Sequence, residues 1–149
     1  MFVDASAIIA VLAEEPKAAE VLAALQSQGG PFVLSPLTVF EATLGLTRAR
    51  LGRGRTITDG DIAAVLAAVI KFLEALRAEE ADVSPYLARK AVDAAARFGR
   101  IVGHPADLNF GDCFAYAHAQ ARGEALMFVG NDFIHTDVRS ALDDPRPMR

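Results

Sequence analysis

Cysteine is nearly absent from this sequence, which holds only Cys113 among its 149 residues. No disulfide can therefore form within the chain, which is compatible with a reducing compartment. A run of about 18 apolar residues that could cross a membrane is also absent. Met1 to Asp4 show neither the charged region nor the apolar run of a signal peptide. We therefore expect a cytoplasmic protein with no membrane partner.

A net positive charge is absent as well. The formal net charge is -4 and the sequence pI is near 5.3, whereas proteins that bind nucleic acid through bulk charge are usually basic. The histidines, His104, His118 and His135, show no paired spacing with another His or with Cys, so a zinc site is not favoured. Apolar side chains, in contrast, make up 52% of the chain. This is enough for one domain with a sizeable core, and we expect a single domain over residues 1–149.

Hydrophobic periodicity and turn residues predict short strands that alternate with helices. The apolar runs 1–3, 32–34 and 125–129 predict buried strands, and 82–85 predicts a further short strand or turn. Helices are expected at 5–13, 17–28, 36–51, 58–80, 86–100 and 109–122. The order favours an α/β fold with a small central parallel sheet flanked by helices. The third and fourth helices would form a helical hairpin arm over about 36–80.

The stretch 108–117 sets an acid, Asp112, into the first turn of an otherwise apolar helix. Asn109 occupies the expected N-cap position, so a capping box between the two residues is one explanation. The alternative is a carboxylate held rigidly at a cleft. What decides between them is whether other acids of the chain face the same place.

Three other acids are expected at that edge. Asp4 follows the first strand and Asp132 follows the last, although a helix cap and a turn explain each of them individually. The carboxyl ends of parallel strands share one edge of a sheet, and the helix of Asp112 would begin on the same side. Glu41, on the apolar border of the helix after the second strand, can join them. Four carboxylates in one cleft would repel each other unless divalent cations such as Mg²⁺ or Mn²⁺ were bound.

The ordered set of acids, with its flanking residues, resembles the PIN-domain nucleases, and most closely the VapC-type toxins of bacterial toxin-antitoxin pairs. The segments that carry the resemblance are Phe2–Ala7, the helix around Glu41, Asn109–Ala117, and Phe128–Phe133 with Thr136-Asp137. The resemblance implies a PIN-like three-layer domain and an endoribonuclease dependent on Mg²⁺ or Mn²⁺. It assigns Asp4, Glu41, Asp112 and Asp132 as metal-binding and catalytic acids, with Ser6 as a polar neighbour. Asn131 and Asp137 are further candidates for outer neighbours of the acids, although a turn or a cap also explains Asp137.

The metal would activate a water for hydrolysis of the RNA phosphodiester, and Glu41 would bind a second ion or orient that water. The resemblance also implies a homodimer and a VapB-like antitoxin that wraps the hairpin of 36–80. The cationic run of Arg48, Arg50, Arg53 and Arg55 is either a solvated loop or a strip that contacts RNA phosphates at the mouth of the cleft.

Other functions compete with this interpretation. A different Mg²⁺-dependent phosphohydrolase of the haloacid-dehalogenase type would need a second aspartate where Ser6 stands. A receiver-type signalling domain would need a lysine after a late strand, and the lysines are Lys17, Lys71 and Lys90. A non-catalytic α/β binding module, whose acids are merely structural caps, stays open.

Overall fold

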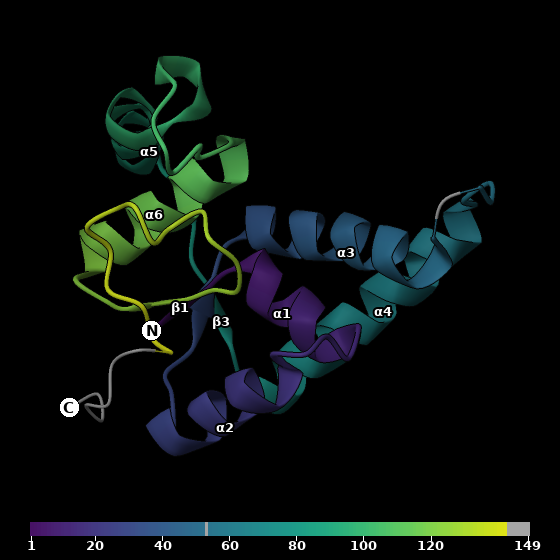
Figure 1. Ribbon diagram of the computed structural model, residues 1–149. Helices are drawn as coiled ribbons and strands as arrows, with labels where there is room; N and C mark the ends of the chain where they lie inside the picture. The colour runs from purple at the N-terminus through teal and green to yellow at the C-terminus, as the bar shows by residue number, and fades with distance from the viewer. Residues whose placement is uncertain (53, 143–149) are drawn as a thin grey trace.

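The fold, seen in a computed structural model that describes residues 1–52 and 54–142, alternates short strands with longer helices (Figure 1). In chain order the elements are β1 (Phe2–Val3), α1 (Ala5–Leu12), α2 (Ala18–Gln28), β2 (Val33–Leu34), α3 (Pro36–Leu51), α4 (Asp59–Leu76), β3 (Glu79–Glu80), α5 (Pro85–Phe98), the 3-10 turn η1 (Arg100–Val102), α6 (Phe110–Arg122) and β4 (Leu126–Met127).

The described strands form one parallel sheet in the order β3-β2-β1-β4. Phe2 is in register with Val33 on one side and with Leu126 on the other. The chain therefore builds β2 and β3 on one side of β1 and then returns to add β4 on the other side. In open parallel sheets such a reversal of strand order opens a crevice at the carboxyl ends of the strands. Asp4 and Asp132 follow the two strands that flank this point.

Alternation along the strands divides the core into two layers. Val3, Leu34 and Met127 pack among residues of α1 to α4, whereas Phe2, Val33 and Leu126 pack among residues of α5 and α6. This is the two-residue period of a sheet that is buried on both faces. Figure 1 shows α5 and α6 on one side of the strands and the other helices opposite. The predicted α/β class, with a small parallel sheet between helices, is confirmed.

The helix predicted over 58–80 is too long. It ends at Leu76, because Arg77 adopts a left-handed conformation with φ of 52°. Glu79–Glu80 then form the edge strand β3, with the Glu79 amide donating to the Phe32 carbonyl at 2.9 Å. Both glutamates are exposed, and an edge strand tolerates charge. The arm therefore ends at 76, and the strand expected near 82–85 lies earlier in the chain.

The helical hairpin is formed by α3 and α4, which run side by side (Figure 1). Each helix begins with a capping box, Ser35 with Thr38 and Thr58 with Asp61. Leu46 of α3 and Val69 of α4 are fully buried in the layer on this side of the sheet. Within the described residues, no helix is both long and apolar enough to cross a bilayer.

Candidate active site

Asp4 lies at the carboxyl end of β1 and caps α1. Its Oδ2 accepts hydrogen bonds from the Ser6 amide at 2.9 Å and from the Ser6 hydroxyl at 2.5 Å. The side chain is only 5% exposed. Burial raises the pKa of Asp4, although the hydrogen bonds from Ser6 and Ala5 act in the opposite direction. A helix cap alone does not require such burial, since caps usually lie at the surface.

Ser6 links the segment that follows β1 to the segment that follows β4. Besides donating to Asp4, its Oγ accepts a hydrogen bond from the Val129 amide at 3.0 Å. Val129 belongs to the segment that leaves β4 and leads to Asp132. The predicted neighbour of the acids is thus placed beside Asp4, and it ties the end of β1 to the loop after β4.

Asp112 stands in the first turn of α6, in the capping box expected with Asn109. The Asn109 side chain accepts from the Asp112 amide at 3.2 Å, and Asp112 Oδ2 accepts from the Asn109 amide at 2.8 Å. Burial raises the pKa of Asp112 to about 6, the Asn109 bond lowers it, and the charges of Asp4 and Asp132 raise it further. The predicted cap is confirmed, and the same carboxylate also lies within the electrostatic reach of two other acids.

Glu41 of α3 reaches the first turn of α6. A Cβ built on Gly111 would overlap both carboxylate oxygens of Glu41, so a larger residue at 111 would displace the end of the Glu41 side chain. Burial raises the pKa of Glu41 to about 7, and the charges of Asp4 and Asp112 add to the effect. Glu41 is thereby brought to the edge where Asp4 and Asp112 lie. Gly111 lies in the stretch 108–117, but no local sequence pattern indicates its contact with Glu41, because the two residues are 70 positions apart.

Asp132 completes the group from the turn after β4. Its own side chain is exposed, and its charge raises the pKa of both Asp4 and Asp112. Arg100, in η1, lies within range of the same acids: its bond to Asp107 is the main cause of its raised pKa, and Asp112 and Asp132 contribute. No sequence pattern singled out Arg100, because its position depends on how η1 packs beside α6.

Asp137 and Asn131, the other predicted neighbours of the acids, make contacts of their own. Asp137 binds Tyr116 and Arg97 instead. Asn131 lines a separate cavity with Lys17.

Of the cationic run, Arg48 and Arg50 stand in the last turn of α3, at the far end of the hairpin, and Arg55 follows before α4 begins (Figure 1). The run begins about 10 Å along α3 from Glu41, at a rise of about 1.5 Å per residue. There Arg50 donates to the Leu12 carbonyl at 3.0 Å and Arg55 pairs with Asp61 at 2.9 Å. Arg48 is exposed, and Arg53 lies outside the described residues.

The donor set fits a hard divalent cation. All four side chains offer carboxylate oxygens, the ligands that Mg²⁺ and Mn²⁺ prefer. In the part of the chain that the structure describes, no three His, Cys, Asp or Glu side chains already converge as a finished metal site. The raised pKa values of Glu41 and Asp112, caused mainly by burial and further by neighbouring acids, nevertheless indicate that keeping both carboxylates charged costs stability. A cation would offset this cost and draw the carboxylates together.

A family model for the PIN domain matches residues 1–139. The chain belongs to the PIN domain family. The resemblance inferred from the sequence motifs is thereby confirmed, and the nucleases of this family are in general metal-dependent.

Named relatives align with this PIN domain over nearly its whole length. A VapC ribonuclease of Rhizobium meliloti is 42% identical over 139 residues, which cover 92% of this chain and 98% of the relative. Ribonuclease VapC28 of Mycobacterium tuberculosis is 41% identical, covering 96% and 98% of the two chains. Ribonuclease VapC42 of the same species is 34% identical, covering 95% and 98%.

Proposed function

We propose that this PIN domain is an endoribonuclease dependent on Mg²⁺ or Mn²⁺ and the toxin of a toxin-antitoxin pair. What supports the proposal is that Asp4, Glu41, Asp112 and Asp132 lie close enough for their charges to raise one another's pKa, with Glu41 against Gly111. Relatives that align over nearly the whole chain are named ribonucleases, which supports RNA as the substrate. Because cellular RNA is cytoplasmic in bacteria, the enzyme would act in the cytoplasm.

Asp4, Asp112 and Asp132 would hold the metal ion, and Glu41 would bind a second ion or orient the attacking water. The bound metal lowers the pKa of a water and neutralises charge that develops on the scissile phosphate. Ser6 holds the Asp4 carboxylate through Oδ2, and the capping box holds Asp112 in the same way. Arg100 places a positive charge beside the acids, where it favours the approach of a phosphate.

The alternative is a non-catalytic protein in which the acids only cap helices, and two of the acids do form such caps. Asp4 caps α1, and Asp112 belongs to a capping box. Capping does not explain Glu41, which lies in the second turn of α3 and still reaches the first turn of α6. Nor does capping require that carboxylates from separate elements come close enough to raise the pKa of one another. A metal-dependent nuclease accounts for both features.

A VapB-like antitoxin would bind along the α3–α4 hairpin. RNA would contact the cations at the hairpin tip, where Arg48, Arg50 and Arg55 lie more than a helical turn from the acids. Such contacts would add affinity for long RNAs without touching the metal ligands.

The homodimer is best assigned to another surface, which we call the α5–α6 groove. It is an apolar groove of about 610 Å³ bordered by α5, η1 and the start of α6. Its members Val92, Ile101 and Phe110 are 67%, 86% and 69% exposed. The hairpin exposes Phe40 and Leu66, at 63% and 40%, whereas Val65, Val69 and Leu73 of α4 are buried within this chain. A second copy covering the groove would remove the large apolar side chains from water.

Isothermal titration with Mn²⁺ tests the metal site. Asp4→Asn is a suitable variant because Asn also caps helices, so α1 keeps its start. We expect Asp4→Asn and Asp112→Asn to weaken Mn²⁺ binding about ten-fold or more and to abolish cleavage of a single-stranded RNA. Asp82→Asn, which removes an exposed acid elsewhere, is the control.

Two results would contradict the proposal. Wild-type Mn²⁺ affinity in both variants would show that these acids do not form the site. A wild-type protein that binds Mn²⁺ through them and cleaves no RNA would rule out the nuclease.

A further inference from the structure

The loop that carries Asp132 is anchored at both ends. At its start the Val129 amide bonds to Ser6. At its end Asp137 follows Asp132 by five residues and bonds to helices on the other face of the sheet. Between the anchors, Phe133 is buried and its ring lies 5.0 Å from that of Phe128. The exposed Asp132 is therefore held by its neighbours along the chain.

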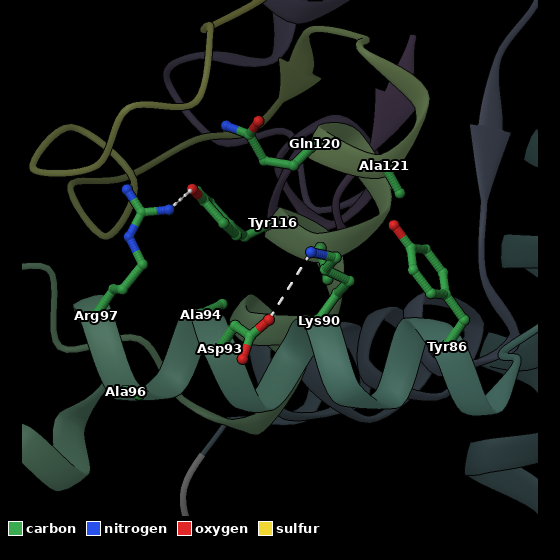
Figure 2. A pocket seen from close by; sticks show the side chains of 10 residues that line it. Tyr86, Lys90, Asp93, Ala94, Ala96, Arg97, Tyr116, Gln120 and Ala121 are labelled. Carbon is green, nitrogen blue, oxygen red and sulfur yellow. Dashed lines mark hydrogen bonds and ion pairs between the residues drawn. The ribbon is translucent and has the colours of Figure 1, made fainter.

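The second anchor is a closed set of hydrogen bonds among Asp137, Tyr116 and Arg97, which we call the Asp137 clamp. The Tyr116 hydroxyl donates to Asp137 Oδ1 at 2.5 Å, and Arg97 Nη2 donates to Oδ2 at 2.7 Å. Arg97 Nη1 also donates to the Tyr116 oxygen at 3.1 Å, the contact that Figure 2 shows across the pocket between α5 and α6. Gln120 Nε2 adds a longer bond to Oδ1 at 3.3 Å. Both carboxylate oxygens of Asp137 therefore accept hydrogen bonds within the clamp.

The Asp137 clamp can fix the position of Asp132 relative to Asp112. Tyr116 lies four residues after Asp112 on α6, so the two side chains lie on the same face of that helix, one turn apart. Fixing Asp137 on Tyr116 therefore fixes the loop of Asp132 relative to Asp112. Burial and the bond to Asp137 raise the pKa of Tyr116 to about 12, so the hydroxyl keeps its donating proton. The bonds from Tyr116 and Arg97 lower the pKa of Asp137, so the acceptor stays ionised.

We propose that Asp137 is a positioning residue, clamped by Tyr116 and Arg97 so that Asp132 reaches the metal ion held by Asp112. The inference rests on the proposed metal-dependent function. The Arg97 and Asp137 side chains are each 54% exposed, and an ion pair in water stabilises a fold little. The clamp should therefore affect metal affinity far more than global stability.

Mn²⁺ titration without RNA, on Asp137→Asn and Tyr116→Phe, tests the clamp. We expect Asp137→Asn to weaken Mn²⁺ binding about ten-fold, with a melting temperature close to that of the wild type. Cleavage of RNA at saturating Mn²⁺ should return toward the wild-type rate, because the ligands themselves remain. Tyr116→Phe removes the hydroxyl and keeps the packed ring, so it should show a smaller loss of affinity. Asp93→Asn, which removes an exposed acid from α5 near Lys90, is the matched control and should bind as the wild type does.

The outcomes separate the clamp from the metal site. Wild-type Mn²⁺ affinity in both variants, while Asp132→Asn binds weakly, overturns the clamp alone. A wild-type protein that binds no Mn²⁺, or an Asp4→Asn variant that binds as tightly as the wild type, overturns the metal site and the role of the clamp with it. If Asp137→Asn fails to fold, Tyr116→Phe decides: unchanged affinity overturns the proposal, and reduced affinity with a normal melting temperature supports it.

Discussion

At the scale of single residues, Asp4 and Asp112 have two roles that do not exclude each other. Each accepts capping hydrogen bonds through Oδ2, and each is held in one orientation by doing so. A capped carboxylate is a pre-positioned one, which suits a metal ligand. Glu41 differs because it has no cap to form, and its burial beside the other acids is a cost to the folded protein.

The raised pKa of Glu41 predicts how the stability of the folded protein changes with pH. Its pKa in the folded state is raised from 4.5 to about 7, so between these values the folded state binds more protons than the unfolded state. Stability without metal should then fall as pH rises through this range. Glu41→Gln imitates the neutral form. We expect it to melt about 3–6 °C above the wild type at pH 8 in chelator, after allowance for solvent screening.

At pH 4.5 the Glu41→Gln difference should disappear, and with Mn²⁺ present the wild type should gain more stability than the variant. Glu74→Gln, an exposed change on α4, is the control in these thermal melts. Equal melting temperatures for Glu41→Gln and the wild type at pH 8 would contradict the strain assigned to Glu41.

At the scale of elements, the site depends on how closely α3 approaches the start of α6. Gly111 permits this approach, because any Cβ there would overlap the Glu41 carboxylate. Strand β3 also depends on the position of a neighbouring element. β3 forms where the chain leaving α4 meets the free edge of β2, although two glutamates carry no strand signal of their own.

Gly111→Ala tests the contact between Glu41 of α3 and the first turn of α6. In a helix this change usually stabilises, by about 0.8–1 kcal/mol. Here the added Cβ would meet the far end of the flexible Glu41 side chain, so we expect a smaller gain in stability than at an open helix position and weaker Mn²⁺ binding, because Glu41 must move. Gly60→Ala, in the first turn of α4 with no atom closer than 3.8 Å to the added Cβ, is the control. Urea unfolding and Mn²⁺ titration check both variants, and normal Mn²⁺ affinity in Gly111→Ala would contradict the contact.

At the scale of the whole molecule, the sheet separates two surfaces with different expected uses. The hairpin projects from one side of the sheet, and the α5–α6 groove lies on the other (Figure 1). The groove borders Asn109 and Arg100, next to the acids. A dimer formed through it would bring two acidic sites toward each other.

Light scattering at micromolar concentration tests that dimer. We expect a mass twice the 15.8 kDa of one chain. Ile101→Glu places a charge in the groove and should give a monomer, since a buried unpaired charge opposes association. Ile134→Glu, at a side chain 56% exposed in the loop after β4, should stay dimeric. A monomeric wild type or a dimeric Ile101→Glu would remove the groove as the interface.

The sequence by itself determined the order of the acids, the capping boxes and the buried strands, because these signals are local. Asn109 with Asp112, and Thr58 with Asp61, lie within one turn, and their caps form as predicted. The edge occupied by Asp4 and Asp132 followed from the rule that parallel strands share their carboxyl ends.

Only the tertiary structure decided the contacts between residues far apart in the chain. Glu41 meets Gly111 because two helices pack closely there. Asp137 turns away to Tyr116 and Arg97 because their donors satisfy it, and the arginine run ends at the hairpin tip because α3 continues to Leu51. Such contacts depend on shape and on the spare hydrogen-bonding capacity of distant side chains, which no local periodicity records.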